Sequence, residues 1–192
     1  MNEKNPQRQV RGRKIYLRYV TYGDFDEMMA LFESSREFYQ GLVNPPQDRA
    51  GFQIYVDRNL DPANECFVIC RKSDGRIAGA INLTQIFRKS FQNAYLGYSL
   101  GVDFTGRGYM TEAVKLILLH AFENLKLHRV EANVQPHNSP SIKVLERCGF
   151  TKEGFSRKYL MIDDVWCDHE RWAIIAEDWS EITKKSEWKK AR

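Results

Sequence analysis

Two glycines, Gly106 and Gly108, separate an apolar, aromatic run from a long amphipathic stretch. The run 94–102 predicts a strand, and the stretch after the turn carries apolar side chains at helical spacing: Met110, Ala113, Val114, Ile117 and Ala121. Glycines let the backbone approach a ligand closely, and the first N–H groups of a helix have no partner within it. Because the helix dipole adds partial positive charge there, the pattern predicts a phosphate or pyrophosphate site, with a tight turn as the alternative.

Two better-known phosphate motifs are excluded by the residues that follow Gly108. A P-loop closes with Gly-Lys-Ser/Thr, but here the glycine is followed by Tyr109, Met110 and Thr111. A dinucleotide fingerprint needs a third small residue at the position of Thr111, and it opens a βαβ unit instead of standing near mid-chain. The anion site is therefore expected to be of another kind.

The composition is that of one soluble domain. Of the 192 residues, 43% are hydrophobic and 28% are charged, and a chain of this length can bury a sizeable core. No apolar run approaches the roughly 20 residues that span a bilayer, and the polar, basic N-terminus lacks the apolar centre of a secretory signal. We therefore expect a cytoplasmic, single-domain protein over 1–192, with flexible or peripheral ends at 1–12 and 180–192.

Charge and thiol content indicate neither a nucleic-acid-binding motif nor a metal site. The net charge is +4, with basic residues gathered at both ends; this favours a polyphosphate ligand or an RNA-rich neighbourhood, or is a solvated surface. The cysteines form no Cys-x-x-Cys pair and predict buried free thiols in a reducing compartment. The histidines are scattered without metal-ligand spacing, so no metal is expected.

Alternating and helical periodicities predict an α+β fold with one parallel crossover. The expected sheet is mixed and mostly antiparallel, with about seven strands flanked by about four helices. Strands are predicted at 15–19, 65–71, 76–87, 93–102, 128–134, 151–161 and 165–176. Helices are predicted at 24–35, at 48–60 with Leu60 facing inward, at 109–125, and at 140–148 with Ser139 as its cap and Gly149 as its end.

Several short stretches occur in an order shared by one enzyme superfamily: 79–83 (GAINL), 95–101 (YLGYSLG), 106–113 (GRGYMTEA), 136–141 (PHNSPS), 149–150 (GF) and 153–154 (EG). On these residues the chain resembles the GCN5-related N-acetyltransferase (GNAT) superfamily, over roughly 13–178. Tyr159-Leu160, Trp166 and Asp168-His169 resemble its bacterial RimJ/RimL group, the ribosomal-protein-alanine N-acetyltransferases. The resemblance implies the GNAT fold.

The same resemblance implies acetyl-coenzyme A as the donor. In the superfamily a Q/R-x-x-G-x-G/A loop holds the pyrophosphate, and it is matched here by 105–110, with Thr105 and Met110 as departures. The implied cofactor-binding residues are Leu100, Gly101 and Val102 beside the pantetheine arm, Gly106, Arg107, Gly108, Tyr109 and Met110 at the pyrophosphate, and Asn138 and Ser141. The strand from Val130 would splay away and open a slot for the thioester.

Acetyl transfer from a thioester to an amine needs a hydrogen-bond donor that stabilises the oxyanion, an acid for the leaving thiolate, and a neutral amine. A backbone N–H near Leu100 is the candidate donor, and the Ser141 hydroxyl is the candidate acid. An N-terminal α-amine has a pKa of about 7.7–8.0 against about 10.4 for lysine, so it needs a weaker base.

The base is less well defined, because Tyr95 stands where many relatives carry a glutamate. Glu131, His137 and Glu65 are alternatives chosen by position, and Glu131 is the preferred one. Pairing with Arg129 is the structural alternative for Glu131.

The expected function is acetylation of a protein N-terminal α-amine, with a ribosomal protein as the implied acceptor. The candidate acceptor-binding residues are Asn82, Arg88, Tyr98 and His137. A small-molecule amine acetyltransferase, acting on a polyamine, an antibiotic or an amino acid, is one alternative, and a non-catalytic acetyl-CoA-binding or ribosome-associated protein is another. No membrane partner is expected, and the protein is expected to be a monomer or homodimer.

Overall fold

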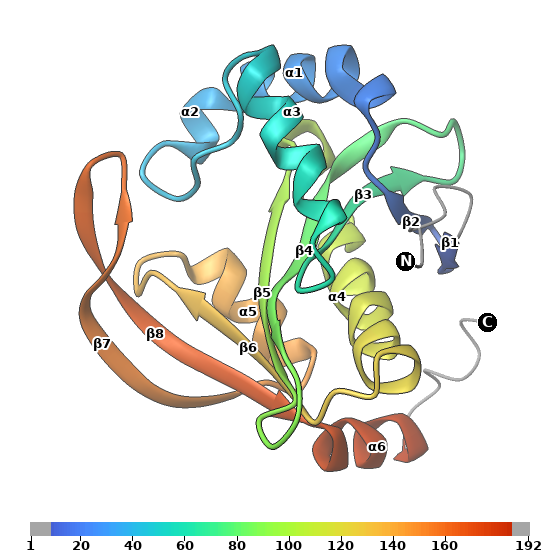
Figure 1. The fold of residues 1–192 in the computed structure, drawn as a ribbon, viewed down its shortest axis with the longest axis vertical. Coiled ribbons are helices and arrows are strands. Elements are labelled where there is room, and N and C mark those ends of the chain that lie inside the picture. Colours follow the sequence, from blue (N-terminus) through green and yellow to red (C-terminus); the bar gives the residue numbers. More distant parts are fainter. Residues whose placement is uncertain (1–8, 186–192) are drawn as a thin grey trace.

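In the computed structural model, which describes residues 9–185, eight strands form one sheet in the order β1-β2-β3-β4-β5-β6-β8-β7 (Figure 1). The strands are β1 (Gln9–Arg11), β2 (Ile15–Tyr19), β3 (Glu65–Arg71), β4 (Ile77–Phe87), β5 (Asn93–Leu100), β6 (Arg129–Val134), β7 (Thr151–Ile162) and β8 (Val165–Ile175). The helices are α1 (Phe25–Ser34), α2 (Arg36–Tyr39), α3 (Arg49–Asp57), α4 (Tyr109–Leu119), α5 (Ser139–Arg147) and α6 (Ala176–Lys185).

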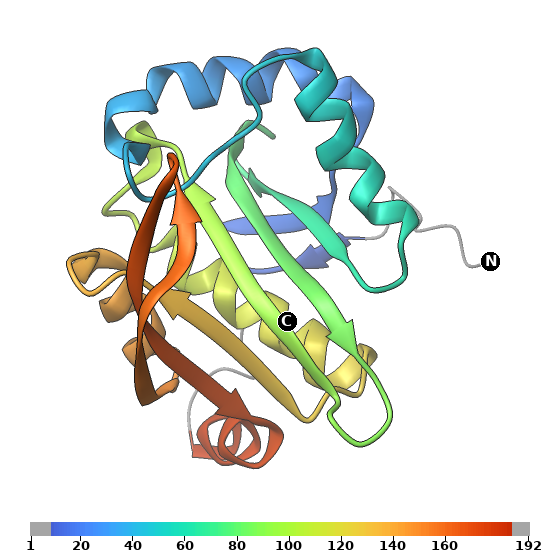
Figure 2. The same ribbon diagram turned by 60° about the vertical axis from the view of Figure 1, so that its left-hand side comes forward.

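The sheet is split between β5 and β6. These strands run parallel, joined by the crossover helix α4, whereas the other neighbouring strands pair antiparallel among the residues described. Their pairing covers three rungs, and the last joins Tyr95 to Glu131. Beyond that rung the strands diverge, as Figures 1 and 2 both show. The splay expected after Val130 is therefore present, and it opens beside the C-terminal half of β5.

Different helices cover the two faces of the sheet. Asn82 and Leu83 follow one another in β4, so their side chains point to opposite faces. Asn82 accepts a hydrogen bond from the Tyr55 hydroxyl of α3 (2.9 Å), which defines the α3 face. Leu83 lies opposite Glu65 of β3, which contacts His120 at the end of α4; this defines the α4 face.

The predicted GNAT fold is confirmed, with differences at its edges. The eighth strand is β1, a three-residue edge strand inside the N-terminal stretch 1–12. Helices α2 and α6 raise the described helices to six; α6 includes 180–185, and 186–192 lie outside the described residues. Leu60 is 81% exposed rather than inward, because α3 ends at Asp57 and a 3₁₀ turn follows it.

The cap of α5 also differs from expectation. Its N-cap is Asn138, whose side-chain oxygen accepts from the amide of Ser141 (3.2 Å), and Ser139 is the first residue of the helix. At the other end Gly149 has φ +87°, as a helix-terminating glycine requires.

The four cysteines form no disulfide: Cys66, Cys70 and Cys148 are buried, and Cys167 is partly exposed. Among the residues described, no helix has the length and apolar character needed to cross a membrane.

Candidate active site

The glycine turn has the conformation that a ligand-cradling loop requires. Gly106 and Gly108 have φ +72° and +79°, in the left-handed region that side chains disfavour. A Cβ placed on either glycine would meet no other atom within 4 Å, so the loop borders open space. Gly108 is also the N-cap residue of α4, and no side chain caps that helix. The first amides of α4 therefore remain available to an anion, which fits the predicted pyrophosphate cradle.

The glycine loop is held by hydrogen bonds to the residue that precedes β2. Lys14, just before β2, donates its Nζ to the carbonyl oxygen of Arg107 (3.0 Å). Its main-chain N–H donates to the Glu112 carboxylate in the first turn of α4 (2.8 Å), and the amide of Ile15 lies 3.3 Å from the same oxygen. These contacts hold the loop and the start of the helix in one arrangement.

The backbone of β5 offers fewer free groups than the sequence predicts. Gly101 donates its N–H to Ala78 (2.8 Å), and Val102 donates to the Ser35 hydroxyl (3.0 Å). Because hydrogen bonds alternate along an antiparallel strand, the bond made by Gly101 turns the backbone groups of Leu100 and Tyr98 toward the diverging side. Leu100 is therefore positioned as a donor beside the slot, whereas the amides of Gly101 and Val102 are already engaged.

Ser141 lies in the first turn of α5 beside β5. Its hydroxyl is 2.7 Å from the hydroxyl of Tyr98, and its amide is bonded to Asn138. Tyr98 lies opposite Ile81, and therefore on the α4 face. The Tyr98 hydroxyl therefore turns to α5 and away from the face that carries Asn82, and its role at an acceptor groove stays a prediction.

Glu131 stands on the last rung between β5 and β6, beside Tyr95, and shares its α3 face. Its carboxylate accepts a hydrogen bond from Nε of Arg129 (2.8 Å). The two terminal nitrogens of Arg129 also donate to the Glu153 carboxylate. Burial and the charge of Glu131 raise the pKa of Tyr95. The carboxylate thus lies at the vertex of the split, where β5 and β6 begin to diverge. It is ion-paired with Arg129, which is the alternative that the sequence left open.

Glu65 is not available to an acceptor amine. Glu65 is 6% exposed, and its side chain lies on the α4 face. Its carboxylate accepts from the Tyr19 hydroxyl and lies 3.2 Å from Nε2 of His120. It belongs to a buried polar cluster and is rejected as a candidate base.

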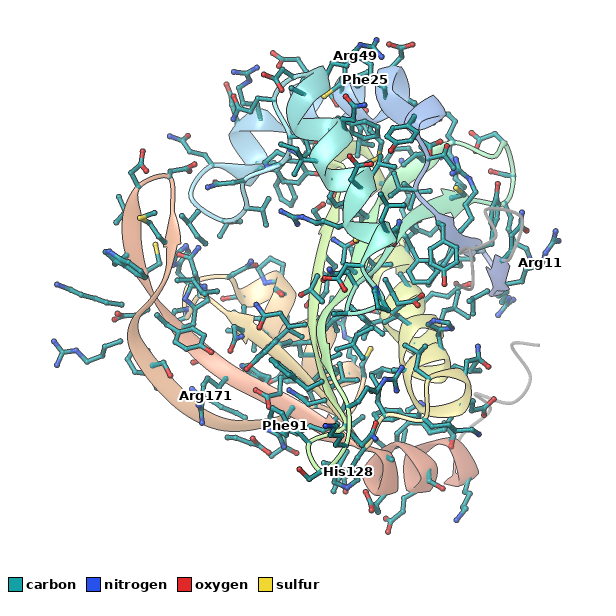
Figure 3. The ribbon with its side chains drawn as sticks, viewed as in Figure 1. Arg11, Phe25, Arg49, Phe91, His128 and Arg171 are labelled. Atoms are coloured by element: carbon teal, nitrogen blue, oxygen red, sulfur yellow. The ribbon has the colours of Figure 1, made fainter. Side chains whose placement is uncertain are left out.

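Two other predicted residues lie apart from the vertex. Arg88 follows β4 and donates to the carbonyl oxygen of Leu125 (2.6 Å), at the hairpin end of β5. Figure 3 shows the neighbouring Phe91 at the end of the sheet opposite Phe25 of α1. At about 3.3 Å per residue, the length of β5 separates this end from Leu100 by about 25 Å, so Arg88 lies far from the diverging part of the sheet and its acceptor role stays a prediction. His137 is exposed in the β6–α5 loop.

A contact not expected from the sequence bridges the open side of the split. The tip of the β7–β8 hairpin reaches the α2–α3 loop, where the Gly41 amide donates to Asp163 (3.2 Å). Gln135, just after β6, donates to the carbonyl oxygen of Gly41 (2.5 Å). A cavity of about 360 Å³ lies here under α1 and α2, with Glu33, Glu37 and Asp163 among its lining residues. Asp163 lies in the break between the strands predicted at 151–161 and 165–176, but its contact with Gly41 was not readable from local sequence.

Comparison with known proteins agrees with this architecture. Residues 14–151 match the acetyltransferase (GNAT) domain family. A split sheet with a glycine loop at a helix N-terminus is thus the scaffold of an acetyltransferase. The chain belongs to the GNAT family and is an acetyl-CoA-dependent N-acetyltransferase.

Three relatives illustrate the range of similarity. A probable N-acetyltransferase of Bacillus subtilis, YjcK, is 38% identical over 177 residues, covering 88% of this chain and 98% of its own. The ribosomal protein uS5-alanine N-acetyltransferase of Escherichia coli is 40% identical over 104 residues, or 54% of each chain. The structure of Mycobacterium smegmatis RimJ in complex with CoA-disulfide superposes with a TM-score of 0.79 and 28% identity, covering 90% of this chain and 87% of that one.

Proposed function

We propose that this enzyme acetylates the N-terminal α-amine of a protein, with a ribosomal protein as the class of acceptor. The observation that carries the proposal is the 40% identity to the uS5-alanine N-acetyltransferase. Because that match spans about half of each chain, the acceptor is inferred from the similarity together with the chemistry of the site.

The donor's place follows from the glycine loop. We infer that the amides at the start of α4 bind the pyrophosphate, and that Asn138 and Ser141 contact the pantetheine arm. The N–H of Leu100, on the diverging side of β5, is suited to stabilise negative charge on the thioester oxygen during attack. Acetyl-CoA supplies the activated acetyl group, and the protein supplies position, hydrogen bonds and proton acceptance.

Glu131 is the proposed proton acceptor for the attacking amine. Glu131 lies at the vertex, and its charge can attract an ammonium and accept a proton through water. Its ion pair with Arg129 fixes the position of the carboxylate, 2.8 Å from Nε. An α-amine, with a pKa of about 7.7–8.0, is neutral in about a tenth of molecules at pH 7, whereas a lysine amine is neutral less than about a thousandth of the time. An α-amine therefore needs less help from the enzyme to become neutral than a lysine amine does.

One observation favours a second candidate, a small cationic amine. The cavity of about 360 Å³ beside the hairpin tip is lined by Glu33, Glu37 and Asp163, with Arg36 as a cation. Glu33 is ion-paired with Arg36, and the other two carboxylates, Glu37 and Asp163, suit a polyamine as well as a basic peptide.

A panel assay separates these functions. Acetyl transfer is measured from acetyl-CoA to Ala- and Ser-starting peptides, to the same peptides with a blocked α-amine, and to polyamines, antibiotics and free amino acids. We expect the highest kcat/KM for a peptide with a free α-amine. Fast turnover of a small amine without transfer to any peptide would overturn the proposal.

A further inference from the structure

The side chain of Tyr98 is directed at Ser141 from across the slot. Tyr98 belongs to β5 and Ser141 to α5, 43 positions later, and their hydroxyl oxygens are 2.7 Å apart. The Tyr98 hydroxyl is also 3.4 Å from the Ser141 carbonyl oxygen, a longer and weaker contact. The two residues meet where β6 has left β5, so the pair borders the opening that the split creates.

Ser141 is held on its other side as well. The Asn138 side chain accepts from its amide (3.2 Å), which fixes the first turn of α5. With the backbone fixed by Asn138 and the hydroxyl contacted by Tyr98, the serine oxygen has a defined place.

The environment of Tyr98 keeps its phenol protonated. Burial raises the pKa of the Tyr98 phenol well above its usual value, so the phenol keeps its proton. Cys148 also faces Tyr98, and because burial raises the pKa of that thiol to about 12, it stays neutral. The partly buried phenol has two oxygens within hydrogen-bond reach, and Oγ of Ser141 is the closer of them. Both hydroxyls carry a proton, so either one can donate across the 2.7 Å contact; when Tyr98 donates to Oγ, the proton of Ser141 points elsewhere.

We propose that Tyr98 is a positioning residue: by donating to Oγ of Ser141, it aims the serine proton at the leaving sulfur of the thioester. This inference rests on the proposed function, in which Ser141 contacts the pantetheine arm, and on the candidate role of its hydroxyl as the acid for the leaving thiolate. The amine nitrogen forms a bond to the acetyl carbon, and the carbon–sulfur bond breaks with its electron pair going to sulfur. Sulfur takes the proton of Ser141, and the proton lost by the amine restores the serine hydroxyl through solvent.

The test is a double-mutant cycle with Tyr98→Phe and Ser141→Ala, followed by kcat, by KM for acetyl-CoA and by melting temperature. Losing one hydrogen bond should lower kcat about three- to tenfold in Tyr98→Phe, with KM for acetyl-CoA nearly unchanged. In the Ser141→Ala background, Tyr98→Phe should have no further effect, because its target is gone. Tyr16→Phe, which removes a hydroxyl from β2 on the far side of β3 and β4, is the matched control and should keep full activity.

Two outcomes overturn the inference: an unchanged kcat in Tyr98→Phe, or an equal loss in both backgrounds, which marks a packing role. The cycle is run on whichever amine the wild-type enzyme acetylates fastest. Failure of α-amine acetylation therefore refutes the proposed acceptor without deciding the cycle, and failure of the cycle refutes the role of Tyr98 without deciding the acceptor.

Discussion

The main-chain N–H of Lys14 donates to the Glu112 carboxylate across 98 positions of sequence, at 2.8 Å. The same lysine donates its Nζ to the carbonyl oxygen of Arg107 (3.0 Å), so one residue before β2 holds both the glycine loop and the first turn of α4. The carboxylate also lies where a helix dipole favours negative charge. The proposed phosphate site thus depends on a segment far from it in sequence.

Lys14→Met should weaken acetyl-CoA binding, because the carbonyl oxygen of Arg107 loses its tether and the loop gains freedom. We expect Kd for acetyl-CoA to rise about three- to tenfold, the value of one hydrogen bond. Calorimetric titration measures this directly. Lys72→Met removes a similar lysine-to-carbonyl bond, to Gly12 (2.6 Å), and serves as the control. An equal weakening in both variants would contradict the tether.

Gly108→Val should impair acetyl-CoA binding more strongly. A β-branched residue at φ +79° is strained, and its side chain enters the open space beside the loop. We expect KM for acetyl-CoA to rise at least about tenfold, since strain of about 1–3 kcal/mol opposes the binding conformation. Gly75→Val carries comparable strain, at φ +76° in the β3–β4 turn. If it changed KM as much as Gly108→Val, the loop assignment would be wrong.

Glu131→Gln should lower kcat/KM most at low pH, where the acceptor amine is charged and needs a proton acceptor. As the pH rises above about 8, the α-amine becomes neutral unaided and the difference from wild type should shrink. The measurement is kcat/KM from pH 6 to pH 9 on one peptide. Glu153→Gln removes the other carboxylate bound to Arg129 and should leave the profile unchanged. Matching profiles for the two variants would remove Glu131 from the mechanism.

We expect the free energy of unfolding to depend on pH through the Asp24 carboxylate. Burial would raise the pKa of Asp24, but hydrogen bonds from Arg18 and from the amide of Thr21 outweigh it and lower that pKa. A lowered pKa stabilises the fold above the unfolded value near 3.9, and the effect disappears as pH falls through the folded value. Asp24→Asn should therefore lower the free energy of unfolding by about 2 kcal/mol at pH 7, with the loss shrinking below pH 4.

Urea unfolding at several pH values tests this pair. Asp74→Asn is the control, because the Arg71–Asp74 pair is a solvent-accessible ion pair and should contribute little. A loss in Asp24→Asn that stayed constant down to pH 3 would show that the charge of Asp24 is not its source.

Local signals accounted for most of the fold. The Gly106–Gly108 turn, the apolar strands and the helix-ending Gly149 carry their structure in residue type and spacing, so their positions were readable. The edge strand β1 was not, because three residues are too few for a periodic pattern. The α5 cap was misplaced by one residue, since Asn138 and Ser139 are both good capping residues and only the loop geometry chooses between them.

The site was harder to read because it depends on faces and on long-range pairing. Alternation separates Tyr95 from Tyr98, but the face that each one meets is set by which helices pack there. The burial of Glu65 follows from its contact with His120, 55 positions away. Likewise the contact of Asp163 with Gly41 joins segments 122 positions apart, which no local pattern specifies.

The most direct test of the central claim is the position of the acetyl group on a peptide that carries both a free α-amine and an internal lysine. The peptide begins with alanine and is incubated with enzyme and acetyl-CoA at pH 7, and tandem mass spectrometry locates the modification. We expect acetylation at the α-amine, with the lysine unmodified. Acetylation of the lysine with a free α-amine would contradict it.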